Sequence, residues 1–439
     1  MILKNKIMNE LNICIAGLGN VGSALIESIE KNNIFFQNKL SLKINIIGIS
    51  AKSKNKERKI NILKYKWFDN PSDMTKLSNC NVIVELIGQE KGISYDLIET
   101  ALNNNIHVVT GNKALIANHG KKLFEIAEKK SLALSFEAAV AGGVPIIKVI
   151  KNDIAMNKIF KISGILNGTT NYILSKMEDD NLSFDEVLQI AKDKGFTSDY
   201  EAELDIGGLD AAHKLTILST LAFGSELNFS CNYVEGIDSV KIEDINFAKK
   251  LGYRIKLISE SSITDNQIFN FTSPKLVKYE NPLSNVGGAL NAINIESDHL
   301  DNLFLEGQGA GGKPTASSVL SDLFDIAQNS SFDNLGYKIH NLNQFEKYPS
   351  KNINNSFYIR IMAEDKAGVL STITKNFTDQ GISIEKILQI PENLKNNLAV
   401  PIIITTHKVN KNTLVSVLAN LEKLDFVKEK ITLLPIHDN

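Results

Sequence analysis

Short apolar runs alternate with amphipathic segments over residues 1–135. Residues 11–16 are apolar with β-branched side chains, and the segment from Ala24 to Ile29 repeats apolar positions at helical spacing. Three more apolar runs of strand length follow, separated by segments long enough for helices: 44–49, 82–87 and 106–110. The alternation predicts an α/β fold with a doubly wound parallel sheet of the Rossmann type.

The pattern changes after residue 135. Residues 136–305 combine glycine-bearing loops, polar turns and long helical patterns, which predict an α+β unit. A second glycine cluster then precedes Pro314, and proline is favoured in the first turn of a helix. We expect that helix to return to the first sheet, so that residues 306–330 complete the domain formed by residues 1–135.

The C-terminal quarter begins with a polar, asparagine-rich stretch. Its composition predicts a linker over residues 331–355, followed by a small domain over 356–439. Apolar periodicity in that domain predicts the order βαββαβ, a sheet with helices on one face. The expected strands are 357–361, 382–390, 399–406 and 427–434, with helices after Val369 and around 414–421.

Composition excludes several classes of function. The 48 basic and 50 acidic side chains give a net charge of -2, which argues against a general nucleic-acid binder and against docking on an anionic membrane. Three cysteines cannot supply a disulfide framework for 439 residues. No apolar run is long enough for a signal core or a membrane span. We expect a cytoplasmic protein with small-molecule partners.

A glycine-rich turn follows the first predicted strand and precedes a helix. In Gly17-Leu18-Gly19-Asn20-Val21-Gly22 the first glycine permits a sharp turn, the second admits a pyrophosphate and the third allows close helix packing. The turn therefore predicts dinucleotide binding, although glycines also occupy ordinary turns. The second strand ends without the acidic residue typical of NAD-selective proteins, and Lys52 and Lys54 follow. These cations favour NADP over NAD, and a solvated basic loop is the alternative.

Three charged residues are candidates for proton transfer. Asp210 and Lys214 are one helical turn apart, on one face. Lys113 follows the strand 106–110, at the edge where open α/β sheets bind ligands. By spacing alone, Asp210 and Lys214 could equally form an exposed ion pair worth about 0.3–0.5 kcal/mol. A catalytic role requires that Lys113 and Lys214 converge on one pocket.

Longer motifs give the chain a resemblance to a known family. It resembles the homoserine dehydrogenases of the monofunctional bacterial type with a C-terminal ACT domain. The matching stretches, in order along the chain, are 17–22, 111–115, 136–145, 164–172, 205–214 and 306–311. The resemblance implies NAD(P)-dependent interconversion of L-homoserine and L-aspartate 4-semialdehyde, a step toward threonine and methionine. The alternative is a dinucleotide and amino-acid sensor without catalysis, which would not need Lys113, Asp210 and Lys214 together.

The resemblance also implies roles for individual residues. Lys214 resembles the acid/base lysine, Asp210 the residue that orients it and helps bind substrate, and Lys113 the second lysine near nicotinamide and substrate. The family's substrate glutamate lies where this chain has a longer segment without proline; an ungapped count from Lys214 gives Asp199, with Glu201 as the alternative. Further candidates are Gly168, Thr169 and Asp205 for substrate and Gly309 for cofactor.

A cation and an effector complete the expectations from the resemblance. The family's monovalent cation, such as sodium, is held at places matched here by Glu137, Val140, Gly142 and Val144, for which a plain tight turn is the alternative. In the ACT-like domain, the loop Asp365-Lys366-Ala367-Gly368 matches the effector loop, which implies inhibition by L-threonine. Assembly into a homodimer or homotetramer is expected, and a domain retained for assembly alone is the alternative to regulation.

Overall fold

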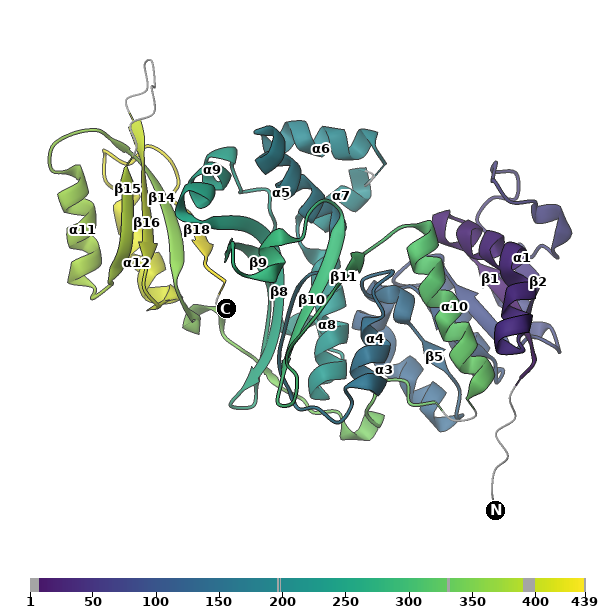
Figure 1. The fold of residues 1–439 in the computed structure, drawn as a ribbon. Helices are drawn as coiled ribbons and strands as arrows, with labels where there is room; N and C mark the ends of the chain where they lie inside the picture. The colour runs from purple at the N-terminus through teal and green to yellow at the C-terminus, as the bar shows by residue number, and fades with distance from the viewer. Residues whose placement is uncertain (1–7, 196, 198, 330–331, 390–398, 438–439) are drawn as a thin grey trace.

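A five-stranded parallel sheet forms one end of the molecule, as the sequence predicts (Figure 1). The computed structural model describes residues 8–195, 197, 199–329, 332–389 and 399–437. The strand order is β2-β1-β3-β4-β5, so the order reverses between β1 and β3, where such sheets bind ligands. The elements are β1 (Glu10–Ala16), α1 (Asn20–Leu40), β2 (Lys43–Ser50), β3 (Val82–Glu85), α2 (Ile93–Asn103), β4 (His107–Thr110), α3 (Lys113–Lys129) and β5 (Leu134–Ser135).

Helix α10 (Gly312–Gln328) lies against α1 although nearly 300 residues separate their starts. Figure 1 shows the two helices side by side on one face of the sheet. Five apolar residues of α10 belong to the same buried core as β1: Ala316, Val319, Leu323, Ile326 and Ala327. The expected return of this helix to the first sheet is confirmed.

A second, mixed sheet lies in the middle of the molecule, in the order β11-β10-β6-β8-β9-β12, with β7 pairing β9. Its main strands are antiparallel, whereas β7 and β12 run parallel to β9. The strands are β6 (Ile159–Ile165), β7 (Asn232–Val234), β8 (Tyr253–Thr264), β9 (Gln267–Lys278), β10 (Leu290–Ser297), β11 (Asp301–Gln308) and β12 (Glu346–Lys347). The helices of this region are α4 (Ile146–Lys148), α5 (Gly168–Asp180), α6 (Phe184–Asp193), α7 (Asp199–Ile206), α8 (Leu209–Phe223) and α9 (Ile242–Leu251).

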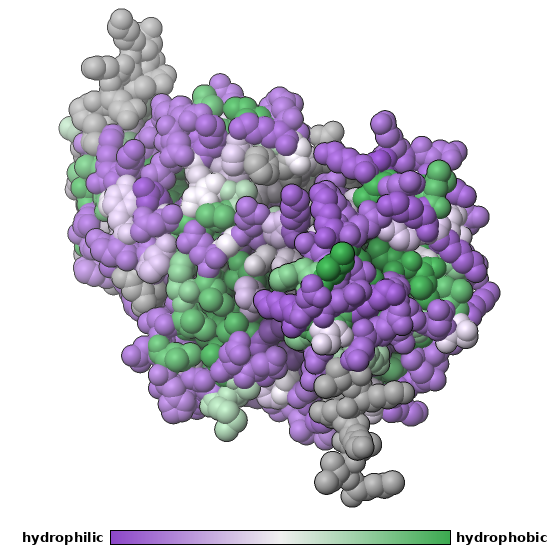
Figure 2. All heavy atoms as spheres, turned by 45° about the vertical axis from the view of Figure 1, so that its right-hand side comes forward, coloured by the Kyte–Doolittle hydropathy of each residue, from purple (hydrophilic) through white to green (hydrophobic). Residues whose placement is uncertain are grey.

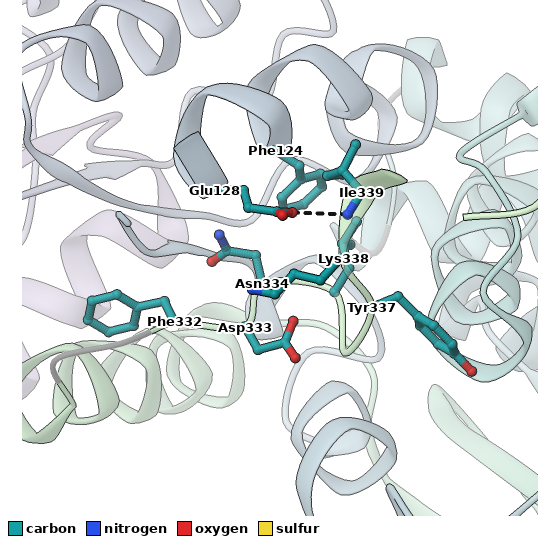
Figure 3. A pocket seen from close by; sticks show the side chains of 9 residues that line it. Phe124, Glu128, Phe332, Asp333, Asn334, Tyr337, Lys338 and Ile339 are labelled. Atoms are coloured by element: carbon teal, nitrogen blue, oxygen red, sulfur yellow. Dashed lines mark hydrogen bonds between the residues drawn. The ribbon is translucent and has the colours of Figure 1, made fainter. Parts of the chain in front are cut away.

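The segment after α10 packs against the first sheet. Asn334 accepts a hydrogen bond from the Leu134 amide and donates one to the Leu132 carbonyl, which continues the edge beyond β5. The Ile339 amide donates to Glu128 of α3 at 2.9 Å, beside a small cavity (Figure 3). The polar stretch that composition marks as a linker therefore makes specific backbone contacts.

The C-terminal sheet has the order β15-β16-β14-β18 with two helices, the predicted βαββαβ arrangement. Its elements are β14 (Phe357–Glu364), α11 (Val369–Asp379), β15 (Ile384–Gln389), β16 (Ala399–Thr406), α12 (Lys411–Leu421) and β18 (Thr432–Pro435). The last strand is shorter than the predicted 427–434, because Val427 makes only an isolated bridge with Ala363 before the ladder begins at Thr432. Residue 390 of the predicted strand 382–390 lies outside the described residues.

The C-terminal sheet docks on the central region of the molecule through buried polar contacts. Arg360 on β14 forms a fork with both carboxylate oxygens of Asp244 on α9, at 2.7 and 3.2 Å. His437 lies 2.6 Å from Glu260 of β8 through Nδ1. Arg360 thereby holds the ACT-like sheet to α9, and His437, which follows β18, holds it to the central sheet.

Hydrophilic side chains cover most of the face drawn in Figure 2, with apolar areas between them. A few large apolar side chains are more than half exposed, among them Phe35, Leu63 and Met156. Within the described ranges, no helix combines the length and apolar character required to cross a membrane.

Candidate active site

Two residues of α8 form the centre of the site. Gly208, with φ +80°, turns the chain into the helix, and Asp210 in the first turn lies below Lys214. Lys214 Nζ is 2.7 Å from Asp210 Oδ2, and both side chains are buried. The pair is therefore a buried one, which excludes the exposed ion pair considered from spacing alone.

Lys113 reaches the same carboxylate from the first sheet. It begins α3 directly after β4, where Asn112 caps the helix by accepting a hydrogen bond from the Leu115 amide. Its Nζ lies 3.0 Å from Asp210 Oδ1, so the two lysines occupy the two oxygens of one carboxylate. Burial acts to raise the pKa of Asp210, but the ammonium groups of Lys113 and Lys214 outweigh it and hold that pKa well below its usual range.

The turn between β6 and α5 supplies contacts that sequence reasoning missed. The Leu166 carbonyl accepts a hydrogen bond from Lys214 Nζ at 2.7 Å. Asn167 caps α5 through the Thr170 amide, and its Nδ2 donates to both Asp205 and Asp210. An Asn before Gly-Thr-Thr is an N-cap signal, so its position could have been predicted, but its two carboxylate partners could not.

The predicted substrate residues gather around this turn. Burial, reinforced by the Asp210 carboxylate, raises the pKa of Asp205, although hydrogen bonds from Thr169 and Asn167 oppose the rise. Gly168 lies against the Ala289 carbonyl, where a Cβ would come within 2.6 Å of the oxygen. Asp199 and Glu201 belong to α7, but their side chains lie outside the described part of the structure.

The glycine turn has the shape that dinucleotide binding requires. A Cβ on Gly17 would lie 2.3 Å from the Leu86 carbonyl oxygen, and one on Gly22 would lie 2.0 Å from the Gly17 carbonyl oxygen. A Cβ on Gly19 would meet nothing within 4 Å, so this glycine leaves open the space that a phosphate would approach. The residues present therefore fit a dinucleotide.

The basic segment lies beside that turn. Lys52 and Lys54 are exposed, whereas Arg58 folds the segment by donating to the carbonyls of Ser53 and Leu18. Arg58 thus ties the cationic loop to the glycine turn, a role that its position in sequence did not reveal. Gly309 packs against Asn291, whose Cγ would lie 2.0 Å from a Cβ there.

Glu85 at the end of β3 is a further residue that sequence reasoning missed. Its buried carboxylate accepts hydrogen bonds from the Ile87 and Gly88 amides and from Ser94 and Thr110. β3 therefore ends at Glu85, two residues earlier than the predicted strand 82–87. The hydrogen bonds of Glu85 also hold the loop that faces the glycine turn. A lone Glu in an apolar run is the signal that could have indicated it.

The predicted cation loop surrounds a buried carboxylate. Glu137 accepts hydrogen bonds from the Ile147 and Lys148 amides, and its own amide donates to Asp322 of α10. Burial and repulsion from Asp322 raise the pKa of Glu137 to about 7, and burial raises that of Asp322 to about 6. Two buried carboxyl groups with raised pKa values fit a nearby cation.

The carbonyl groups of this loop already have partners. The Gly142 carbonyl accepts a hydrogen bond from Ser318, and the Val144 carbonyl accepts one from the Ile146 amide. Ala141 and Gly142 have positive φ, which turns Val140 and its neighbours through a tight bend. A carbonyl oxygen has a second lone pair, so these contacts are compatible with cation binding.

The predicted effector loop is exposed between β14 and α11. Asp365, Lys366, Ala367 and Gly368 are all exposed, and Gly368 has φ +91° at the helix N-cap. Hydrogen bonds from Lys366 and Lys428 lower the pKa of the neighbouring Glu364 to about 2.

Comparison with known proteins identifies the family. Three family models match: the NAD-binding domain of homoserine dehydrogenase at residues 17–137, homoserine dehydrogenase at 145–324 and the ACT domain at 357–426. The homoserine dehydrogenase of Neisseria gonorrhoeae is 35% identical over 440 residues, covering 98% of this chain and 100% of the relative. The chain belongs to the homoserine dehydrogenase family.

Solved homoserine dehydrogenases share the fold. The enzyme from Thiobacillus denitrificans superposes with a TM-score of 0.89 at 33% identity, covering 98% of both chains. A hyperthermophilic archaeal homoserine dehydrogenase solved in complex with NADPH gives a TM-score of 0.62 at 26% identity, covering 74% of this chain and 99% of that one. The protein is an NAD(P)-dependent oxidoreductase acting on a CH–OH group, which excludes the non-catalytic sensor.

Proposed function

We propose that Lys214 is the general acid and base of homoserine dehydrogenase catalysis. Hydride addition to the aldehyde carbon of L-aspartate 4-semialdehyde builds charge on the carbonyl oxygen, and an ammonium group can stabilise and then protonate that oxygen. The cluster of the half-exposed Lys113 with the buried Asp210 and Lys214 carries the proposal, because Asp210 holds both ammonium groups on one carboxylate. Asp210 is the orienting residue, and Lys113 stabilises charge from the side of the first sheet.

A pair of buried lysines allows a matched test. In Lys214→Met, kcat for homoserine oxidation is expected to fall by about 10²- to 10⁴-fold, the range for loss of a general acid or base. Lys256 is the control, because it is equally buried and hydrogen-bonded to Asn171 and the Val286 carbonyl, away from Asp210. Equal kcat losses in Lys214→Met and Lys256→Met, at equal folded fractions, would refute the assignment.

The cofactor proposed is NADP, with NAD as the alternative. When bound, the nicotinamide supplies or accepts the hydride. The amides of Leu18, Asn20 and Val21 would hold the pyrophosphate at the start of α1. Gly17, Gly19 and Gly22 give the turn its shape. Lys52 and Lys54 would meet the 2′-phosphate, and Lys113 and Gly309 would face the nicotinamide. The NADPH complex of the archaeal relative supports this preference.

Substrate binding is assigned to the turn before α5. Asp205 lies near Asp210, Thr169 bonds Asp205, and Gly168 begins the same helix. An acidic side chain from α7 would bind the substrate ammonium group. Asp199 and Glu201 remain the two candidates. Replacing the correct one by its amide should raise KM for homoserine, whereas the other amide variant should leave KM unchanged.

A sodium ion is proposed at Glu137, with the carbonyl groups of Val140, Gly142 and Val144. The raised pKa values of Glu137 and Asp322 support it, because a cation would stabilise both ionised forms. Its binding should raise the melting temperature in sodium chloride above that in choline chloride.

L-Threonine is the proposed effector at residues 365–368, in an assembly of two or four chains. The exposed loop and the buried contact between Arg360 and Asp244 support a regulatory module attached to the central sheet. Millimolar threonine should inhibit the enzyme, and Asp365→Ala should relieve the inhibition; equal activity with and without threonine would support assembly alone. We propose the domain division 1–135 with 306–330, then 136–305, 331–355 and 356–439.

A further inference from the structure

The Leu166 carbonyl receives hydrogen bonds from two side chains of different elements. Lys214 Nζ donates from α8 at 2.7 Å, and Asn291 Nδ2 donates from β10 at 3.0 Å. Asn291 is fully buried, and its carboxamide lies against Gly309, where a Cβ would come within 2.1 Å of Oδ1. A side chain confined in this way holds its N–H group in one direction.

The Leu166 carbonyl helps to set the direction of the Lys214 ammonium group. An ammonium group has three N–H donors. Two of those on Lys214 are taken by Asp210 Oδ2 and the Leu166 carbonyl, both at 2.7 Å. Because the group is tetrahedral, fixing two donors also fixes the third, which is the one left for the substrate oxygen.

We propose that Asn291 is a positioning residue for catalysis, holding the Leu166 carbonyl so that the third N–H of Lys214 points at the reacting oxygen. The inference rests on the proposed role of Lys214. Leu166 lies in the turn between β6 and α5, so its carbonyl depends on side-chain contacts to stay in place. Small errors in the position of a catalytic group cost large factors in rate.

The other end of the same carboxamide supports this role. Asn291 Oδ1 is buried and has no hydrogen-bond partner among the described residues. Burying an unpaired amide oxygen is unfavourable, and an apolar side chain would avoid that cost. Stability alone therefore does not explain why this residue is an asparagine. The hydrogen bond from Nδ2 to the Leu166 carbonyl does explain it.

Asn232 is a closely matched control. Its side chain is also buried, its Nδ2 donates to a backbone carbonyl, that of Phe229, at 2.8 Å, and its Oδ1 likewise has no partner in the described part of the chain. It also contacts α8, but at Thr216. Asn232 therefore reproduces the chemistry of Asn291 without touching the carbonyl that holds Lys214.

The test compares Asn291→Ala and Asn291→Asp with Asn232→Ala and Asn232→Asp in the full-length enzyme. For the Asn291 variants, kcat for homoserine oxidation should fall by about tenfold to hundredfold. KM for homoserine and NADP+ should stay within about twofold, because ground-state binding is unchanged. The deuterium isotope effect with homoserine labelled at C4 should rise, because the chemical step becomes rate-limiting. The Asn232 variants should keep the wild-type kcat and isotope effect.

Two results would overturn the proposal: equal kcat in the Asn291 and Asn232 variants, or a lower kcat in the Asn291 variants with an unchanged isotope effect, which indicates a structural role. Asn291→Asp preserves the side-chain shape, so its kcat and isotope effect are used if Asn291→Ala does not fold. Lys214→Met separates the two assignments. An active Lys214→Met refutes the proposed acid/base role, whereas an inactive Lys214→Met beside fully active Asn291 variants refutes only the positioning role.

Discussion

The buried carboxyl pair Glu137 and Asp322 should make the stability of the enzyme depend on pH. Both groups have a folded-state pKa above the ordinary value, about 7 against 4.5 for Glu137 and about 6 against 3.8 for Asp322. A raised acid pKa contributes stability that is complete below the ordinary value and is lost as pH rises through the folded value. Without a cation, the free energy of unfolding should therefore fall between about pH 4 and pH 7.

The size of this fall follows from the same values. At about 1.36 kcal/mol per pH unit, each group corresponds to about 3 kcal/mol, and the two are not additive because each repels the other. Asp322→Asn removes one of the charges and its repulsion of Glu137, while an amide oxygen can still accept the hydrogen bond of the Glu137 amide. We expect the variant to lose about 3 kcal/mol less stability than wild type across this pH range.

Urea unfolding followed by circular dichroism in choline chloride, from pH 4 to pH 7, measures the difference. Asp325→Asn is the control, because Asp325 is on the same helix, pairs with Lys148 at 2.6 Å and is far more exposed than Asp322. It should keep the wild-type pH slope. Parallel slopes for wild type and Asp322→Asn would refute the reasoning. Sodium chloride should flatten the wild-type slope if the proposed cation binds.

Other predictions follow from single contacts. Gly22→Ala should lower the melting temperature strongly, because its Cβ would meet a backbone oxygen at 2.0 Å. Gly19→Ala should keep the wild-type melting temperature and raise KM for the cofactor in kinetic assays. Lys52→Glu should raise KM for NADP+ at least tenfold more than KM for NAD+, a difference of about 1.4 kcal/mol; equal changes would support a solvated loop. Arg360→Met should cost about 3–5 kcal/mol by leaving Asp244 buried without its counter-ion, as measured by urea unfolding. A loss no larger than that of Lys241→Met, which removes an exposed ion pair with Glu429, would contradict the docking described.

The sequence predicted those parts of the site whose chemistry resides in side-chain type and local spacing. The glycine turn and the pair Asp210 and Lys214 are local patterns, and the strand end before Lys113 follows from apolar periodicity. The Leu166 carbonyl and Asp322 were missed because their roles depend on contacts across 48 and 185 residues. A backbone carbonyl carries no signal in residue type. The last strand was predicted too long because Val427 was taken as its apolar start, although the three residues that follow Val427 are charged and the ladder begins only at Thr432.

The return of α10 to the first sheet has a consequence for the order of events on the ribosome. Residues of β1 emerge first, yet their buried core includes Val319, Leu323 and Ile326 of α10. The N-terminal third therefore leaves the ribosome with an incomplete core, and its apolar face is exposed until residue 328 has been synthesised and has folded back. Closure of this core is a long-range step, and steps of that kind slow folding.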